Sequence, residues 1–354
     1  MTLRDLQAAA GATFTNTEVA QTFPDDRAAL AAATETPGGV ALYDRSHWGR
    51  LRLGGDDRLR FLHNQTTNDI QRLQADECCE TTFVTSTART IDLATVIFTD
   101  EAAIAIVSPE RRAALLPLLD RYIFPMDRVE LSDVTDETVC FSAIGTGGTA
   151  LCARLGVACP EPGKHLEVEI AGAPVRLAAT QGLSRSELTL VADRAAGGSL
   201  WEALVAAGAL PLGDATWDEL RAIDGRPRPD RELTEDYNPL EAGLWHTVSF
   251  DKGCYIGQET IARLKTYKGV KQQLWGLRAE GPEPLAAGAM LMQGERKAGK
   301  VTSAISTPDG AIGLGYVRAK VGGAGLSLTA DGVAVRVVEI PHATRGYLAE
   351  AAAV

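Results

Sequence analysis

The stretch KGCYIGQE (Lys252–Glu259) lies within the most irregular part of the chain, residues Trp217–Lys271. This part is rich in glycine, proline, charged and aromatic residues, which is typical of segments that carry binding groups on a scaffold. Gly253 and Gly257 bracket Cys254, and glycine permits tight turns and close backbone approach. The pattern therefore indicates that Cys254 is the centre of a functional motif.

The residues around Cys254 predict an activated thiol. We expect a helix over ETIARLK (Glu259–Lys265). A helix start near Tyr255 would place Cys254 at the helix N-terminus, where the dipole favours a thiolate. Lys252 would add a positive charge and lower the pKa of the thiol further. Cys254 is then nucleophilic or redox-sensitive. The alternative is a small residue packed where a strand meets a helix.

A carboxylate in apolar surroundings marks a second candidate position. Glu241 follows Asn238–Leu240 and precedes the apolar run Ala-Gly-Leu-Trp. Because a buried carboxylate is costly unless it is paired, the spacing favours a structural ion pair with Arg226 or Arg228. Alternatively, Glu241 points into a pocket and accepts two parallel N–H bonds from a planar heterocycle, such as the edge of a pterin.

Asp92 is a third candidate because it interrupts the apolar run Ile91–Phe98. Acidic residues are disfavoured in central strands, so the pattern by itself favours a side chain that faces solvent. Alternatively, Asp92 points into a site as an acid, a base or an anchor for an amine.

The distribution of apolar residues predicts an α+β fold that ends in a small antiparallel β-barrel. Short strands are separated by the turn pairs Asp309-Gly310 and Asp331-Gly332 beyond Lys271, as in such barrels. A helix is expected over Pro109–Tyr122, although Pro117 lies inside it. Gly145–Gly148 has no lysine, and we expect no helix start of the phosphate-loop kind after it.

Composition limits the function and the cellular location. The 354 residues carry 35 basic against 46 acidic side chains, a formal net charge of -11, which disfavours a nucleic-acid partner. The longest apolar runs are too short for a membrane-spanning helix. The first residues resemble neither a secretory signal nor a transit peptide, so we expect a cytoplasmic protein without membrane contact.

Cysteine and histidine spacing predicts no metal site. No C-x-x-C pair occurs among the six cysteines, and the five histidines stand apart from them and from one another in the sequence. Nothing in the chain is expected to hold an iron–sulfur cluster permanently, and the free thiols fit a reducing compartment.

The motif at Cys254 carries a resemblance to a known family. Residues Lys252–Glu259 resemble the K-G-C-[FY]-x-G-Q-E signature of the YgfZ family. Asp44–Ile70 and NPLEAGL (Asn238–Leu244) resemble segments of the wider superfamily of the glycine-cleavage T-protein. The resemblance implies a T-protein-like clover arrangement, with two interleaved α+β subdomains binding folate in residues 1–268 and a β-barrel domain in 269–354.

The resemblance also implies tetrahydrofolate as cofactor and roles for individual residues. Cys254 matches the motif cysteine tied to activity, Glu241 the carboxylate that holds the pterin, and Asp92 the aspartate that acts on the folate amine. Gln272-Gln273 replaces an arginine of the T-protein, and the T-protein lacks the motif cysteine. Both differences argue against glycine cleavage, since fold resemblance alone does not fix the reaction.

The leading hypothesis is a folate-binding accessory protein that assembles or maintains iron–sulfur clusters in client enzymes. Cys254 would be its functional thiol, and Glu241, Asp92, Lys252 and Arg226 would contact the folate. Basic residues could meet the folate glutamate tail, namely Arg226, Arg228, Arg231, Lys265 and Lys268. The alternative is a tetrahydrofolate-dependent aminomethyl- or methyltransferase. A tRNA-modification factor is a lesser alternative, disfavoured by the acidic balance.

Overall fold

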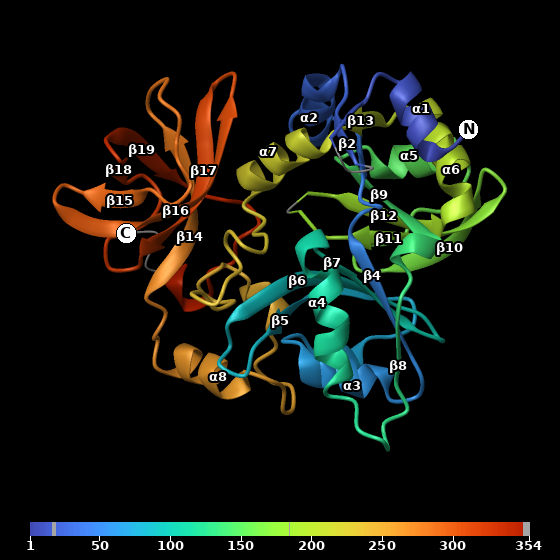
Figure 1. Cartoon of the computed structure of the whole chain (residues 1–354), viewed down its shortest axis with the longest axis horizontal. Coiled ribbons are helices and arrows are strands. Elements are labelled where there is room, and N and C mark those ends of the chain that lie inside the picture. Colours follow the sequence, from blue (N-terminus) through green and yellow to red (C-terminus); the bar gives the residue numbers. More distant parts are fainter. Residues whose placement is uncertain (16–18, 184, 350–354) are drawn as a thin grey trace. The chain divides into compact units, whose positions relative to one another are not determined.

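The computed structural model describes residues 1–15, 19–183 and 185–349 of the chain. It divides into two compact units, and each is built from more than one segment. Figure 1 labels the helices and strands along the chain. The first unit comprises residues 1–61, 70–80 and 94–220, and the second comprises 62–69, 81–93 and 221–354. Within the described residues, no helix is both long and apolar enough to cross a membrane.

A six-stranded sheet forms the centre of the first unit, in the order β10-β11-β12-β9-β3-β13. Its strands are β3 (Ala41–Asp44), β9 (Thr138–Ile144), β10 (His165–Ile170), β11 (Ala173–Thr180), β12 (Glu187–Asp193) and β13 (Leu210–Leu212). Along β9, Val139 and Phe141 join one hydrophobic core, whereas Cys140 and Ile144 join another. Because side chains alternate across a strand, this division shows that both faces of the sheet are covered.

Helices cover the two faces of this sheet. Leu200 and Leu204 of α6 enter the first core, and Ala29 and Ala33 of α2 enter the second. These pairs lie four residues apart, which places both members on one helix face. The elements outside the sheet are α1 (Leu3–Ala9), β1 (Thr13–Phe14), β2 (Ala20–Thr22), α2 (Asp26–Thr34), α5 (Gly148–Leu155), η3 (Arg194–Ala196) and α6 (Gly197–Ala206).

A helix follows the glycine cluster, since α5 begins at Gly148, but the cluster contains no phosphate-loop lysine. The glycines before it serve packing. A Cβ at Gly145 or Gly147 would lie 2.3 Å from the carbonyl oxygen of Gly39 or Gly38, respectively. Only glycine permits this close approach of two backbones.

A five-stranded sheet has the order β5-β6-β7-β4-β8. Its strands are β4 (Gly49–Gly54), β5 (Cys78–Val84), β6 (Thr90–Phe98), β7 (Ala103–Val107) and β8 (Glu130–Asp133). The helical elements near them in the chain are α3 (Arg58–Gln65), η1 (Ile70–Arg72), α4 (Pro109–Asp120) and η2 (Thr135–Glu137). The expected helix at Pro109 is confirmed and runs through Pro117, with Leu115 and Leu119 buried.

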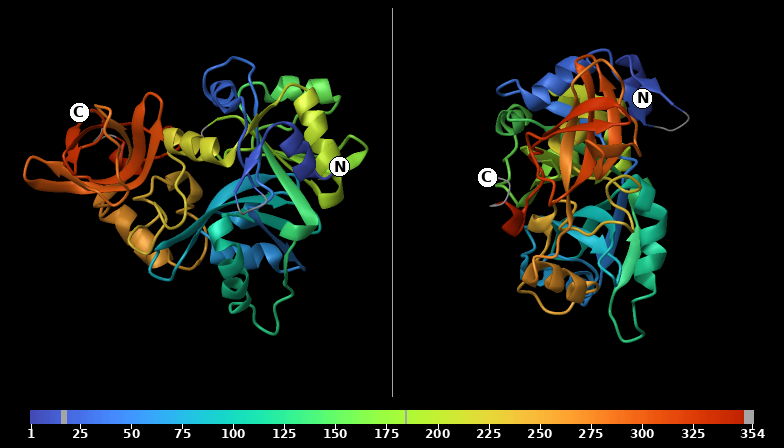
Figure 2. Two further views of the ribbon diagram at one scale, coloured as in Figure 1. Left: turned by 45° about the horizontal axis from the view of Figure 1, so that its top comes forward. Right: turned by 90° about the vertical axis from the view of Figure 1, so that its left-hand side faces the viewer.

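The C-terminal part of the second unit is a closed antiparallel barrel in the order β14-β17-β16-β15-β18-β19. Figure 2 (left) shows it as a ring. Its strands are β14 (Gln272–Ala279), β15 (Met290–Gln293), β16 (Arg296–Thr307), β17 (Gly310–Arg318), β18 (Ser327–Ala330) and β19 (Val333–Val338). Asp331 and Gly332 have φ of 48° and 93°, as a two-residue hairpin turn of type I′ requires. The α+β class with a C-terminal antiparallel barrel is confirmed.

The segment that precedes the barrel has little regular structure. Residues 225–257, all of them described, form no strand and only the short helical turn η4 (Trp245–Thr247). They connect α7 (Asp214–Asp224) to α8 (Gln258–Thr266), and η5 (Gly346–Leu348) follows the barrel. The barrel begins at Gln272, and a domain boundary between residues 268 and 269 stays a prediction. Irregular connections of this length are usually functional.

Candidate functional site

Glu241 is fixed by a reciprocal pair of hydrogen bonds within the irregular segment. The side-chain oxygen of Asn238 accepts the backbone N–H groups of Leu240 and Glu241 at 3.0 and 3.1 Å. In return, Oε2 of Glu241 accepts the backbone N–H of Asn238 at 3.3 Å. The backbone carbonyl of Glu241 accepts the N–H of Leu274, the third residue of β14, at 2.9 Å. The barrel therefore holds this turn in place.

The Glu241 carboxylate is buried, with 6% of the residue exposed. Burial raises its pKa above the ordinary value. The N–H of Asn238, the charge of Arg89 and the side chain of Gln272 act in the opposite direction and lower the pKa. The cations that act on Glu241 are thus Arg89 and Lys271, not the two arginines that spacing favoured. A carboxylate held in this way is ready to accept hydrogen bonds from a polar ligand.

Asp92 in β6 is fully buried, with 0% of the residue exposed. The expectation that it faces solvent is wrong, because both faces of this part of β6 are covered. Its Oδ1 accepts the backbone N–H of Leu93 at 2.9 Å. The buried guanidinium of Arg226 donates to the carbonyl of Leu93 at 3.5 Å. Arg226 therefore lies beside the strand that carries Asp92.

The packing around Glu241 relates it to the other two candidates. Ala242, on one side of Glu241, packs in a hydrophobic cluster that includes Leu93, the neighbour of Asp92. Leu240, on the other side, packs in a cluster that includes Tyr255, the neighbour of Cys254. Glu241 thus lies where two cores of the second unit meet, and each core holds the neighbour of one other candidate residue.

Cys254 is exposed and precedes the helix instead of beginning it. The helix does not start near Tyr255, since α8 begins at Gln258 after Gly257. Gly257 has φ of 82°, and a Cβ there would lie 2.8 Å from the carbonyl oxygen of Thr85. The chain must make this left-handed turn before it can continue as a helix. Cys254 therefore lies on a loop outside the first turn of α8.

Lys252 is directed away from solvent into a set of backbone carbonyls. Its Nζ donates to the carbonyls of His63, Thr66 and Asn68 at 2.5, 2.8 and 2.6 Å. It also lies 4.6 Å from the ring centroid of Tyr255. The three N–H donors of an ammonium match three carbonyls at or beyond the end of α3, where a cation is favourable. This contact anchors the start of the KGCYIGQE motif.

Two lysines of the expected tail-binding group lie over aromatic rings. Nζ of Lys265 is 3.9 Å from the ring centroid of Phe250, and Nζ of Lys268 is 5.8 Å from that of Tyr347. Binding of a folate tail by these lysines and by Arg226, Arg228 and Arg231 stays a prediction.

Sequence reasoning missed a stacked tyrosine pair near these residues. The rings of Tyr237 and Tyr316 stack with centroids 3.5 Å apart and an interplanar angle of 13°. Both belong to the cluster that contains Leu93 and Ala242. Burial raises the pKa of Tyr237 to about 12, so its hydroxyl keeps its proton and can donate a hydrogen bond. The aromatic residue in EDYNP, just before the Asn238 turn, was the available signal.

The first unit contains a cavity of about 900 Å³. Residues of α1 and α6 line it, together with His47, Arg112 and Arg194. None of Cys254, Asp92, Glu241, Lys252 and Arg226 does so. This cavity is therefore separate from the residues that the sequence singled out.

Comparison with known proteins supplies the family. The family described as GCVT N-terminal domain matches residues 3–252. A chloroplastic protein of Arabidopsis thaliana, whose name places it provisionally among the transferases, is 38% identical over 336 residues, covering 93% of this chain and 76% of that protein. The aminomethyltransferase of Rubrobacter xylanophilus is 28% identical over 313 residues, covering 86% of this chain and 84% of that enzyme.

Among solved structures, the glycine cleavage system aminomethyltransferase T from Bartonella henselae has a TM-score of 0.82 at 20% identity and covers 98% of both chains. This likeness shows the fold. The family match includes Asp92, Glu241 and Lys252 and ends just before Cys254. The chain therefore belongs to the GCVT N-terminal domain family and has the fold of the aminomethyltransferase T-protein.

Proposed function

We propose that this chain is a YgfZ-type member of the family, which binds tetrahydrofolate and serves as an accessory protein for iron–sulfur clusters in client enzymes. The observation that carries the proposal is the buried Glu241 carboxylate, held by the Asn238 turn at the meeting of two cores. Burial raises the pKa of Glu241 because it removes water that would solvate the ionised carboxylate. N–H donors of a ligand would take the place of that water and stabilise the ionised form. The edge of a pterin presents two such donors.

Asp92, Arg226 and Lys252 have different roles in this proposal. Asp92, buried in β6, positions the folate amine, and Arg226 supports its strand through the carbonyl of Leu93. Lys252 contributes by anchoring the thiol-bearing loop to the carbonyls beyond α3. Direct contact of Lys252 with folate is disfavoured because its three donors already point at those carbonyls.

Cys254 is the proposed point of contact with iron–sulfur clients or their assembly proteins. It is the one exposed thiol of the six, and an exposed thiol on a loop is accessible to a partner protein. Apart from the adjacent Cys78 and Cys79 of β5, the free cysteines lie on different elements, so any contact of Cys254 with a cluster would be transient and would need ligands from the partner.

A folate-dependent transferase is the second candidate. Relatives named aminomethyltransferase span most of this chain, and the Arabidopsis relative also carries a transferase name. The complete burial of Asp92 favours this reading, since a carboxylate shielded from water can act on an amine in a bound cofactor. The formal net charge of -11 disfavours binding to RNA and so gives no support to a role in tRNA modification. A cytoplasmic location stays a prediction.

Calorimetry with tetrahydrofolate tests the cofactor. We expect saturable binding by the native chain and about tenfold weaker binding by Glu241→Gln, because one charged hydrogen bond is worth about 1.5 kcal/mol or more. Glu280→Gln is the matched control, since Glu280 forms an exposed ion pair with Arg336 in the barrel. Unchanged affinity of Glu241→Gln would remove Glu241 from the site, and absence of binding would reject the folate proposal.

Two further variants separate the two functions. In cells that depend on this protein, an accessory role predicts that Cys254→Ser loses client iron–sulfur enzyme activity while the purified variant binds folate normally. A transferase predicts the reverse, in that Asp92→Asn abolishes one-carbon transfer and Cys254→Ser has almost no effect. Full client activity in Cys254→Ser cells would reject the accessory role.

A further inference from the structure

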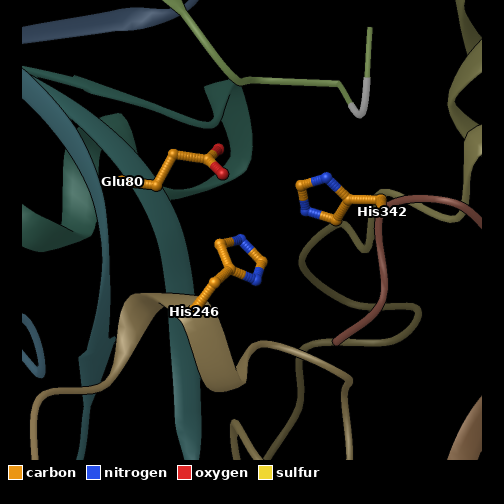
Figure 3. A group of neighbouring side chains, drawn as sticks. All are labelled: Glu80, His246 and His342. Carbon is orange, nitrogen blue, oxygen red and sulfur yellow. The ribbon is translucent and has the colours of Figure 1, made fainter. Parts of the chain in front are cut away.

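Two histidines that are far apart in the sequence meet in the second unit. His246 lies in η4, and His342 follows the last barrel strand. Their rings are 5.2 Å apart between centroids and nearly perpendicular, at 87°. A ring nitrogen of one lies within 4.8 Å of a ring nitrogen of the other. Figure 3 shows the two side chains. Glu80, which Figure 3 also labels, belongs to the first unit.

Thr344 orients the ring of His246. The Thr344 hydroxyl lies 3.1 Å from the carbonyl oxygen of Gly243. The same hydroxyl oxygen accepts the backbone N–H of His246 and contacts its ring Nδ1, both at 3.0 Å. Thr344 therefore engages the Nδ1 side of the ring, and Nε2 is the other ring nitrogen.

In histidines that bind metals, the second ring nitrogen commonly bonds to an oxygen that orients the ring, and the Thr344 hydroxyl oxygen has this position beside Nδ1 of His246. His342 is held from its backbone, where its N–H donates to the carbonyl of Asp224 at 2.8 Å. It is 5% exposed, whereas His246 is exposed. One imidazole is thus fixed in the protein and the other is open to solvent on its outer side.

We propose that His246 and His342 form a binding site for a divalent first-row transition cation, such as Zn²⁺, Co²⁺ or Ni²⁺. Nε2 of His246 and a ring nitrogen of His342 would be the protein ligands, and water would complete the coordination. Imidazole selects these cations over Mg²⁺ and Ca²⁺, which prefer oxygen ligands. The site is independent of the folate proposal and of Cys254.

The required movement is small. Metal–nitrogen bonds of about 2.0–2.1 Å in tetrahedral geometry place two ligand nitrogens about 3.4 Å apart. The two nitrogens lie at most 4.8 Å apart without an ion, so they must approach by about 1.4 Å or less. The approach would come from His246, whose side chain is the more exposed of the two.

The test is titration of the metal-free full chain with Zn²⁺ by calorimetry and with Co²⁺ by visible absorption. We expect one ion per chain and at least tenfold weaker binding by His246→Gln and by His342→Gln. His47→Gln, a half-buried histidine of the first unit, is the matched control and should bind normally. Cys254→Ser should also bind normally, which would exclude the exposed thiol as the ligand.

Because His342 is buried and its variant could fold poorly, nitrogen NMR of the native chain provides a second measurement. Zn²⁺ should shift the Nε2 resonance of His246 much more than its Nδ1 resonance. Absence of saturable binding, binding that both histidine variants retain, or binding lost only in Cys254→Ser would overturn the proposal.

Discussion

We expect Glu232→Ala to lower the free energy of unfolding of the second unit by about 3–5 kcal/mol. Glu232 is fully buried, and its Oε1 accepts the hydroxyls of Thr302 and Ser303 at 2.6 and 2.7 Å. Its Oε2 lies 3.2 Å from Nη1 of Arg221 and accepts the backbone N–H of Arg228 at 3.2 Å. The carboxylate thus joins the irregular segment to β16 of the barrel.

The size of the effect follows from what the variant leaves behind. Arg221 is 1% exposed, so without Glu232 its charge remains buried and loses this ion pair. Replacing both partners, as in Arg221→Met with Glu232→Leu, removes that charge as well. We therefore expect the double variant to lose much less stability than the sum of the two single variants.

Urea denaturation combined with hydrogen exchange of β16 peptides measures this effect in the unit concerned. The matched control is Glu280→Ala, which breaks the exposed pair with Arg336 and should cost at most about 1 kcal/mol. A cost below about 1 kcal/mol for Glu232→Ala, or additive losses in the double variant, would refute the reasoning.

Three further predictions concern the site. Cys254 should react with iodoacetamide at least about tenfold faster than Cys78 and Cys152. Cys254 is exposed, whereas burial raises the pKa of the other two thiols to about 12. Mass spectrometry of the alkylated native chain measures the three rates. Burial raises the pKa of Glu241, so the folded chain keeps this proton to higher pH than the unfolded chain. The free energy of unfolding should therefore fall as pH rises from the ordinary carboxyl range through the raised pKa, and urea titrations of Glu241→Gln should lack that decrease. Lys252→Met should cost at least about 2 kcal/mol of stability because three carbonyls lose their donor, and Lys252→Arg should not restore it in thermal unfolding.

Local patterns were sufficient for much of the fold. The pairs Asp309-Gly310 and Asp331-Gly332 lie at barrel hairpins, because the backbone of such turns requires residues that tolerate positive φ. The helix expected over Pro109–Tyr122 likewise matches α4 (Pro109–Asp120). In each case the residues that determine the turn or helix lie close together in the sequence, so a local pattern was enough to predict it.

The site was less predictable because its deciding contacts are distant in the sequence. The Lys252 ammonium binds carbonyls almost two hundred residues away in the sequence. The residues around Cys254 therefore could not show that Lys252 points at these carbonyls instead of at the thiol. Asp92 was expected to face solvent because acidic residues are disfavoured in central strands. That expectation failed because both faces of this part of β6 are covered. Gly257 did carry a local signal, since a glycine before a helix can mark a left-handed turn, and that signal would have placed the helix start correctly.

The two groups that matter most for the proposed function are supported by different interactions. Glu241 depends on the Asn238 turn, on β14 and on the segment that Glu232 fastens to the barrel. Cys254 depends on the Lys252 anchor and on the turn at Gly257. Because these supports share no hydrogen bond described above, loosening one should leave the other intact. Folate affinity and thiol reactivity should therefore respond independently to Glu232→Ala and Lys252→Met, and a parallel loss of both in either variant would show that they form one cooperative site.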